Sequence, residues 1–599
     1  MAEFNTVSKL TFVTAYLNIY ENSPPLQRTD EWRLNHFKKI AETGIQLCVY
    51  VTQDNQDALL DIAQQYPNIM VMDPVKLEDT FIVKACQEFE GTYTLPDARN
   101  MAKDTEKYLQ LQSCKMEFVQ DALAKNPWNS THFAWIDFNI AYIFKNMVKS
   151  QRQLQILDKC NLSAEFFAMP GCWGQWDVNR HDHHMNHIHW RFCGGFFIAD
   201  KASMFRFCEE YRVRFPEFLR LTNKLLWEVN VWAWIEHVSS KDVWNPRWYI
   251  ADHNDLMIII PNDLICGKLQ NARTIKYNYP AVENYHPTSA SYMFYKDKHW
   301  LNTRFVNYHL TSKSYYTYLD GTGIIKNKNL ITELSKEDTI LMPPSNPDQF
   351  LEMNSETIGL PALTPTGFSR GLEDIRLYVL NDKMRFIATT IEYSPTGRNR
   401  MVVGDYDPEL AIYSNCKVVI PPNPDSWCEK NWVPIIRKNE TSGQDEEWFI
   451  YKWSTMEIGQ LVETDAVYEN GDKAVQLVIS QRYEITNIPW FDRFRGSTIF
   501  MENPQSPGNQ LIGLAHFSEE GSPRHYFHSL VILDKTTLQP LQYSIPFYFQ
   551  NVGVEFCTGM FVEQNEEKNN IYTFWISQMD RDPLLVVVEK SSIIMQMIE

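Results

Sequence analysis

The sequence predicts two domains of different fold class, an α/β domain followed by an all-β domain. Strand and helix signals alternate over about the first 280 residues, whereas short strands separated by turn residues follow from about Asn284 onward. The chain has 599 residues, which is too many for one ordinary hydrophobic core. We therefore expect the α/β domain over residues 1–280 and the all-β domain over residues 281–599.

The α/β prediction rests on buried-strand runs that alternate with helical patterns. A helix capped by Asp30 and ended by Gly44 follows the first strand, and a long helical stretch precedes the fourth. Such alternation predicts a mainly parallel sheet with helices on both faces. The expected strands are 10–15, 45–52, 69–72 and 133–136, and the other expected helices are 58–66 and 104–125.

The all-β prediction rests on a series of short strands without long helical patterns. The strands 376–380 and 384–390 flank Asn381-Asp382-Lys383, which is typical of a hairpin turn. A β-propeller with about four strands in each blade fits the series. A pair of large β-sandwiches is the alternative. Further strands are expected at 418–420, 448–453, 474–479, 511–515, 527–533 and 571–576.

Composition and charge exclude some classes of function. The formal net charge of −18 argues against nucleic acid as a partner, because phosphate neutralisation requires Lys and Arg. The 11 cysteines contain no Cys-x-x-Cys pair and indicate reduced thiols. Met1–Asn5 does not begin a signal-peptide pattern, and no apolar run approaches the roughly 20 residues of a membrane span. We expect a cytoplasmic protein without a membrane span.

The first candidate site lies at the carboxyl ends of the predicted parallel strands, where open α/β sheets bind their ligands. Thr14 and Tyr16 come at the end of the first strand, where a nucleotide base and ribose usually lie. Asp137 ends the strand 133–136, and Asn139 follows two residues later. Asp137 is therefore the candidate metal ligand of this site.

Three later segments add residues to the same site. Gly194-Gly195 interrupts an expected strand over 190–200 and lets a substrate approach the backbone closely. Glu228 opens an aromatic helix and is the candidate general base, while His253 is a candidate second metal ligand beside Asp137. The histidine-rich run 181–189 is expected to form a loop beside this site, with a structural metal as the alternative.

The order of these motifs resembles the WlaTC/HtrL-type glycosyltransferases of bacterial surface-glycan loci, over about residues 8–260. The resemblance implies a GT-A-like (Rossmann-like) fold, a nucleotide sugar as donor substrate and Mn²⁺ or Mg²⁺ as cofactor. It also adds Lys115 and Asn139 to the donor-binding residues, although the usual Asp-x-Asp signature has Asn139 in its second acidic position. The matching segments are Phe12-Val13-Thr14-Ala15, Lys115 to Ala122, Trp135-Ile136-Asp137-Phe138, Gly194-Gly195-Phe196-Phe197, Glu228 and Asp252-His253.

The second candidate site belongs to the all-β domain, where charged residues stand at strand starts after turns. In a propeller such positions converge on one end of the central channel. Two carboxylates there can perform acid/base chemistry on a glycosidic bond, and we take Asp374 and Glu555 as that pair. Salt bridges between blades are the alternative. The candidate residues for binding phosphate or sugar hydroxyls are Arg304, Arg376, Lys430, Asn431, Arg495, Arg524, His528 and Asp580.

This second set resembles the five-bladed mannoside-phosphorylase-like propellers, over about residues 281–599. Glu373-Asp374-Ile375-Arg376 stands where those proteins have Glu-Asp-Pro-Arg, so Ile375 is a departure from the pattern. Lys430-Asn431-Trp432 matches their Lys-Asn-Trp, and Arg304 stands at the first-blade position of an Arg. The resemblance implies a five-bladed propeller that acts on glycosides.

Three functions are compatible with these residues. The leading prediction is a glycosyltransferase that moves a sugar from a nucleotide-sugar donor to a glycan acceptor, with a propeller that binds or processes the glycan. The second is a glycoside phosphorylase or hydrolase that acts through the propeller and carries a degenerate N-terminal domain, an interpretation that Asn139 supports. The third is a non-catalytic glycan-binding protein. A homo-oligomer is compatible with all three.

Overall fold

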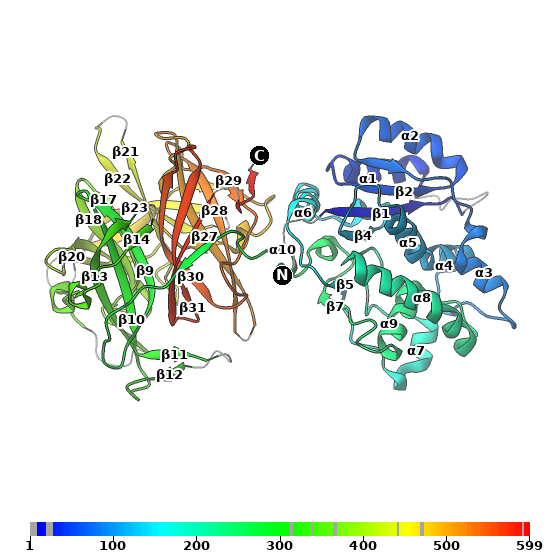
Figure 1. Cartoon of the computed structure of the whole chain (residues 1–599), viewed down its shortest axis with the longest axis horizontal. Helices are drawn as coiled ribbons and strands as arrows, with labels where there is room; N and C mark the ends of the chain where they lie inside the picture. The colour runs from blue at the N-terminus through cyan, green and yellow to red at the C-terminus, as the bar shows by residue number, and fades with distance from the viewer. Residues whose placement is uncertain are drawn as a thin grey trace. The chain divides into compact units, whose positions relative to one another are not determined.

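The computed structural model divides into two compact domains, Met1–Gly267 and Lys268–Glu599 (Figure 1). Met1–Asn5, on which the signal-peptide prediction rests, lies outside the described residues. No helix in the described part of the chain is both long enough and apolar enough to cross a membrane. The structure describes residues 9–19, 28–311, 316–337, 340–362, 368–439, 442–453, 455–467, 473–521, 523–589 and 592–598.

A seven-stranded sheet with the order β3-β2-β1-β4-β6-β5-β7 organises the N-terminal domain. The strands β1 to β4 pair in parallel, whereas β6 runs antiparallel to both of its neighbours. The domain is therefore α/β, as predicted, while the more specific GT-A-like assignment stays a prediction. The strands are β1 (Leu10–Tyr16), β2 (Leu47–Val51), β3 (Ile69–Val71), β4 (His132–Ile136), β5 (Phe167–Gly171), β6 (Phe196–Asp200) and β7 (Arg247–Ile250).

The helices alternate with these strands, with one difference from the prediction. The helix expected over 104–125 is two helices, because Cys114 closes the last turn of α4 and begins α5. Thr29 rather than Asp30 caps α1, through a hydrogen bond from the Trp32 backbone N–H. The helices are α1 (Asp30–Ala41), α2 (Gln56–Gln65), α3 (Phe81–Gln87), α4 (Glu106–Ser113), α5 (Lys115–Lys125), α6 (Met147–Lys159), α7 (His181–Asn186), α8 (Lys201–Thr222), α9 (Glu228–Val238) and α10 (Asn262–Ile265).

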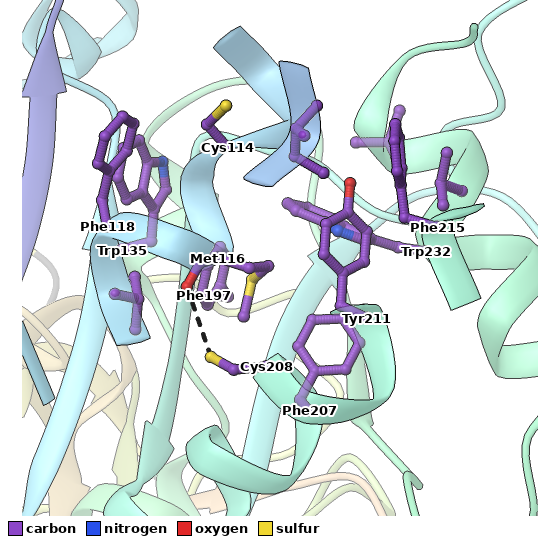
Figure 2. Close-up of a cluster of buried hydrophobic side chains, with 14 of the residues drawn as sticks. Cys114, Met116, Phe118, Trp135, Phe197, Phe207, Cys208, Tyr211, Phe215 and Trp232 are labelled. Carbon is purple, nitrogen blue, oxygen red and sulfur yellow. Dashed lines mark hydrogen bonds between the residues drawn. The ribbon is translucent and has the colours of Figure 1, made fainter. Parts of the chain in front are cut away.

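Large side chains from α5, α8 and α9 pack with the sheet in one core (Figure 2). Phe118 of α5 stacks beside Trp135 of β4, with ring centroids 6.4 Å apart. Phe207 of α8 lies 6.5 Å from the ring of Trp232, which belongs to α9. Burial of rings of this size contributes strongly to stability. The core therefore fixes the first residues of α5 and α9 relative to the end of β4.

Two segments near this position differ from the sequence predictions. The strand expected over 190–200 begins only at Phe196, and Gly194-Gly195 forms the turn before it. The histidine-rich run contains the short helix α7 rather than a loop alone. Asn230 Nδ2 of α9 donates to the carbonyl oxygens of His184 and His187, both at 2.8 Å. These hydrogen bonds hold the end of α7 against α9.

Five groups of mainly antiparallel strands build the C-terminal domain, and their inner strands form a closed ring. Strand β9 contacts β17 and β30, β17 contacts β21, and β27 contacts β30. Gly496 of β25 lies against Val433 of β21, which closes the remaining gap. The domain is therefore a β-propeller and not a pair of sandwiches.

The five blades contain nearly all of the strands of this domain (Figure 1). Blade 1 contains β9 (His286–Tyr295), β10 (Lys298–Val306), β13 (Ile325–Glu337) and β14 (Ile340–Met342), with β15 (Leu351–Glu352) and β16 (Ser369–Arg370) beside β13. Blade 2 contains β17 (Glu373–Leu380), β18 (Lys383–Thr390), β19 (Arg400–Asp407) and β20 (Ile412–Ile420). Blade 3 contains β21 (Val433–Lys438), β22 (Asp445–Lys452), β23 (Met456–Val467) and β24 (Lys473–Tyr483). Blade 4 contains β25 (Arg495–Gly496), β26 (Met501–Glu502), β27 (Gln510–Glu519), β28 (His525–Asp534), β29 (Pro540–Ser544) and β33 (Met595–Met597), and blade 5 contains β30 (Glu555–Gln564), β31 (Asn570–Gln578), β32 (Asp582–Glu589) and β8 (Arg273–Ile275). The short pair β11 (Tyr308–Leu310) and β12 (Tyr316–Tyr318) follows β10.

The predicted hairpin and the closure of the ring are both visible in the strand pairing. Strands β17 and β18 are joined through Asn381 and Asp382, whose φ angles of 47° and 59° fit the tight turn predicted there. Strand β8, the first strand of the domain, pairs antiparallel with β32 and completes blade 5. The boundary predicted at residues 280/281 would separate β8 from the rest of its blade.

Candidate functional site

Four residues that the sequence assigned to the N-terminal site meet around one ammonium group. We call Lys115, Asp137, Gly194 and Glu228 the lysine cluster. Lys115 Nζ lies 3.0 Å from Asp137 Oδ1 and 2.9 Å from Glu228 Oε1, and it donates to the Gly194 carbonyl oxygen at 2.8 Å. An ammonium group has three N–H donors, so each of them has an acceptor. The Lys115 side chain is only 3% exposed.

Asp137 is the part of the lysine cluster that reaches solvent. Its side chain is 38% exposed, compared with 7% for Glu228. Its Oδ1 atom also accepts a hydrogen bond from Trp135 Nε1 at 2.8 Å. Burial lowers the pKa of Lys115, but the Asp137 and Glu228 carboxylates outweigh burial and raise it overall. The cluster therefore contains one cation and two carboxylates.

The two glycines before β6 give the cluster its space. A Cβ atom on Gly194 would lie 2.2 Å from Glu228 Oε1 and 3.2 Å from Lys115 Nζ. A Cβ atom on Gly195 would lie 3.0 Å from Met257 Cε and 3.6 Å from Asp137 Oδ2. At Gly194 the space is thus filled by the protein's own charged side chains.

The candidate residues on β1 do not join the cluster through any hydrogen bond in the described part of the chain. Thr14 Oγ1 is buried and has no partner among the described residues. Tyr16 donates its hydroxyl to Asp30 and stacks on Phe138, with ring centroids 4.6 Å apart. Burial, followed by the hydrogen bond to Asp30, raises the pKa of Tyr16. Asn139 begins a 3₁₀ turn after β4, and its Oδ1 is also buried without a described partner.

The divalent ion predicted at Asp137 stays a prediction. The pKa of His253 is lowered overall. Burial is the largest cause, and the nearby Asp137 carboxylate partly offsets it. The ring of His253 lies 5.7 Å from that of Trp190. However, no three His, Cys, Asp or Glu side chains among the described residues form a metal-binding group. The positive charge beside Asp137 comes from Lys115 instead.

A second cluster lies in the propeller, at the end where β17, β21 and β30 begin. We call Arg304, Tyr308, Glu373, Asp374 and Asp580 the arginine cluster. Arg304 Nη1 donates to Asp374 Oδ1 at 2.9 Å, and Arg304 Nη2 lies 3.8 Å from Glu373 Oε2. The side chains are 10% exposed for Arg304, 17% for Asp374 and 24% for Glu373. The ion pair is therefore shielded without being closed to solvent.

The backbone at Asp374 is held in an unusual conformation. Its φ angle is 51°, in the left-handed region, and the pairing of β17 with β18 shifts register between Glu373 and Arg376. Such a bulge redirects a side chain, and its left-handed residue stores about 1 kcal/mol of strain. The bulge aims the Asp374 carboxylate at Arg304.

Asp580 follows β31 and differs electrostatically from Asp374. Tyr308 donates its hydroxyl to Asp580 Oδ2 at 3.4 Å. Burial raises the pKa of Asp580; Arg304 lowers it, and the nearby Asp374 and Glu373 carboxylates raise it further. The resulting pKa lies above the usual aspartate value. The arginine cluster therefore holds a carboxyl group that retains its proton more readily than a free aspartate.

Arg376 and Asn431 lie behind the arginine cluster. Arg376 is fully buried and donates to the carbonyl oxygens of Ser497 at 2.6 Å, Gly496 at 3.2 Å and Asp374 at 3.2 Å. It also donates to Asn431 Oδ1 at 3.2 Å. Burial lowers the pKa of Arg376 to about 10. These contacts make Arg376 a support for the Asp374 backbone and for β25.

Glu555, the predicted partner of Asp374 in acid/base chemistry, has its oxygen atoms occupied. It is 1% exposed and accepts hydrogen bonds from the backbone N–H groups of Phe549 at 2.6 Å, Gln550 at 2.9 Å and Asn551 at 2.9 Å. Gln578 Nε2 donates a fourth at 3.0 Å. A carboxylate accepts about four such bonds. The contacts thus give Glu555 a role in holding the loop before β30.

His528 also lies away from the arginine cluster. It is fully buried, and its ring centroid is 4.7 Å from that of Phe549. Burial lowers the pKa of His528 to about 3. The side chain is therefore a neutral part of the blade 4 core.

Two of the predicted cationic residues form an exposed basic edge. Lys430 and Arg495 are exposed and have no ion pair in the described part of the chain. Both act on His516, whose pKa is lowered first by burial and also by these positive charges. His516 Nδ1 lies 2.9 Å from Ser497 Oγ. Arg524 is exposed as well but lies 3.3 Å from Glu520.

Sequence reasoning missed Tyr308, His516 and Tyr526. Burial and the Asp580 carboxylate raise the pKa of Tyr526, whereas Arg524 lowers it. Tyr526 therefore stands between acidic and basic side chains. Tyr308 lies four residues after Arg304, and Tyr526 lies two residues after Arg524. Inspection of the tyrosines close to these two arginines would have found both Tyr308 and Tyr526.

No protein-family model and no curated protein sequence matches the chain. Among solved structures, a GH43_1 enzyme from Xanthomonas citri is similar over 51% of this chain and 88% of its own, with 8% identity and a TM-score of 0.30. An endo-arabinase from Bacteroides thetaiotaomicron is similar over 53% of this chain and 97% of its own, with 9% identity and a TM-score of 0.24. An endo-1,5-alpha-L-arabinanase from Thermotoga petrophila is similar over 54% of this chain and 75% of its own, with 9% identity and a TM-score of 0.28.

These similarities correct the leading functional prediction. The predicted nucleotide-sugar glycosyltransferase finds no support among these structures, whose descriptions name a GH43_1 enzyme, an endo-arabinase and an arabinanase. Nothing among them supports a nucleotide sugar or manganese. At 8 to 9% identity and TM-scores of 0.30 or less, they carry no inference about the activity of this chain. Any functional proposal therefore has to rest on the geometry of the clusters.

Proposed function

We propose that the C-terminal propeller cleaves glycosidic bonds, with water or inorganic phosphate as the acceptor. The observation that carries the proposal is the pairing of two unlike carboxyl groups around Arg304. Asp374 accepts a hydrogen bond from Arg304 at 2.9 Å, whereas the pKa of Asp580 is raised. Carboxyl groups in contrasting environments are the usual acid and base of glycoside cleavage.

The proposed roles follow from these environments. Asp580 donates its proton to the glycosidic oxygen as the bond from that oxygen to the anomeric carbon breaks. Asp374, which accepts a hydrogen bond from Arg304, takes a proton from the water molecule that forms the new bond to the anomeric carbon. Tyr308, hydrogen-bonded to Asp580 Oδ2, orients the acid. In this assignment the partner of Asp374 in acid/base chemistry is Asp580 and not Glu555.

The basic edge supports phosphate as an alternative acceptor. Lys430 and Arg495 have no described ion pair, and an oxyanion would meet both cations beside His516. In phosphorolysis a phosphate oxygen forms the new bond to the anomeric carbon, and the base is not needed. The resemblance of Glu373-Asp374-Ile375-Arg376 and Lys430-Asn431-Trp432 to the mannoside-phosphorylase-like propellers supports mannosides as the first substrates to test.

The test is the release of reducing sugar or sugar phosphate from a panel of mannosides and other oligosaccharides, with and without inorganic phosphate. We expect cleavage of at least one substrate by the full chain. Asp374→Asn and Asp580→Asn should each lower kcat/KM in hydrolysis by about 10²–10⁴-fold. In the wild type, activity should fall as the pH rises through the raised pKa of Asp580, because the acid then loses its proton.

Asp57→Asn is the matched control, because Asp57 is an exposed residue of α2 in the other domain. It should leave the rate unchanged. Phosphate-dependent release that is lost in Lys430→Ala and Arg495→Ala would identify a phosphorylase, and phosphate-independent release would identify a hydrolase. Binding of a glycan without cleavage, unaffected by Asp374→Asn, would refute the proposal in favour of a non-catalytic glycan-binding protein.

A further inference from the structure

We infer that Lys115 is the built-in cation of the N-terminal site, and that this site binds its ligand without a divalent metal ion. Three oxygen atoms converge on Lys115 Nζ from separate elements. They are Asp137 Oδ1 after β4, Glu228 Oε1 at the start of α9 and the Gly194 carbonyl oxygen before β6, all 2.8 to 3.0 Å from the nitrogen.

This set of oxygens resembles the first shell of a hard cation. Mg²⁺ and Ca²⁺ bind carboxylate and carbonyl oxygens at about 2.0–2.6 Å. The distances to Lys115 Nζ are longer and match charge-assisted hydrogen bonds from an ammonium group. The ammonium therefore occupies the point at which a metal ion would bind the same three acceptors.

A metal ion cannot easily be added beside the ammonium. Two carboxylate oxygens of the cluster make no contact with Lys115, Glu228 Oε2 on a nearly buried side chain and Asp137 Oδ2 on the more exposed side chain. The more accessible of the two carboxylates is that of Asp137, through Oδ2. A divalent ion on that oxygen would lie a few Å from a buried positive charge, and the two would repel each other strongly in this shielded setting. A divalent ion can therefore bind at the lysine cluster only after the charge of Lys115 has been removed.

The assignment also defines the chemistry that a ligand would meet. One ammonium and two carboxylates leave the cluster with net negative charge, and its half-exposed end is the Asp137 carboxylate. That end accepts hydrogen bonds and repels anions. Hydroxyl or other donor groups of an uncharged ligand therefore suit it, and a diphosphate does not.

The test uses Mn²⁺ alone, measured by electron paramagnetic resonance and by thermal unfolding of the full chain. The wild type should show no saturable binding up to about 1 mM, the range of weak protein cation sites. Lys115→Ala removes the charge and opens space between the three oxygens, so it should bind one Mn²⁺ at least about tenfold more tightly and gain thermal stability from it. Lys115→Met is the matched control, because it removes the charge but fills the space.

Each outcome decides the inference. Gain of Mn²⁺ binding in Lys115→Ala, lost again when Glu228→Gln is added, supports it, and so does a Lys115→Ala protein that folds only with Mn²⁺. A folded Lys115→Ala that binds Mn²⁺ no better than Lys115→Met overturns it. A wild type that binds one Mn²⁺, alone or with inorganic pyrophosphate, and loses it in Asp137→Asn overturns it even if Lys115→Ala does not fold.

Discussion

The lysine cluster and the arginine cluster each place one shielded cation between two carboxylates, but the arginine cluster also contains a third carboxyl group. In the lysine cluster, the three N–H donors of Lys115 are used at 2.8 to 3.0 Å, and Glu228 is almost fully buried. In the arginine cluster, Asp374 and Glu373 keep some exposure, and Asp580 adds a third carboxyl group with a raised pKa.

The difference separates two uses of a buried ion pair. A cluster whose donors and acceptors balance holds elements together, because breaking it leaves a charge without a partner. A cluster with a third carboxyl group, whose pKa is raised, holds a proton that it can give away. The following changes test this contrast, from the largest expected effect on stability to the smallest.

Lys115→Met should destabilise the N-terminal domain by about 3–5 kcal/mol, because it leaves the buried Glu228 carboxylate unpaired. The measurement is urea unfolding followed by hydrogen exchange in peptides of this domain. Glu228→Gln combined with Lys115→Met should recover part of the loss. No recovery would show that the loss comes from packing and not from the unpaired charge.

Arg304→Met should destabilise the propeller by about 2 kcal/mol, the scale of hydrogen bonds to charged groups. The effect is smaller than for Lys115 because Asp374 and Glu373 can be hydrated once the cation is gone. The same exchange experiment on propeller peptides measures it. A loss as large as that of Lys115→Met would remove the distinction between the two clusters.

Gly194→Ala should cost about 1–2 kcal/mol, because its Cβ would lie 2.2 Å from Glu228 Oε1 and push that carboxylate away from Lys115. Gly174→Ala is the control, since nothing lies within 4 Å of a Cβ built there. Thermal unfolding of the two variants compares them. Equal melting temperatures would mean that Glu228 moves aside without loss of its ion pair.

Asp580→Asn should raise the melting temperature of the propeller by roughly 1–3 °C at neutral pH. The folded-state pKa of Asp580 is raised, so its ionisation costs stability once the pH exceeds the unfolded value of about 3.9. The gain should therefore shrink as the pH falls towards 4. A gain that is independent of pH would assign the effect to something other than this carboxyl group.

The sequence predicted the domain classes because periodicity reports them directly, and it located Asp137 and Asp374 because each follows a clear local pattern. It could not give Lys115 its role, since Glu228 lies 113 residues further along the chain. The choice between Glu555 and Asp580 was equally out of reach. It depends on three backbone N–H groups of residues 549–551 that only the folded loop presents to Glu555. The strand position of His528 likewise does not show that the rings of Phe547, Phe549 and His516 lie beside it.

The way in which blade 5 is completed has a consequence for how the protein is made. Ile275 of β8 pairs with Leu585 of β32. The first strand of the propeller therefore cannot pair until one of the last strands has been synthesised. Contacts this far apart in sequence form slowly, and unpaired strand edges invite association with other chains. A fragment that starts at residue 281 would carry that open edge permanently, and we expect it to aggregate where a fragment from Lys268 stays monodisperse.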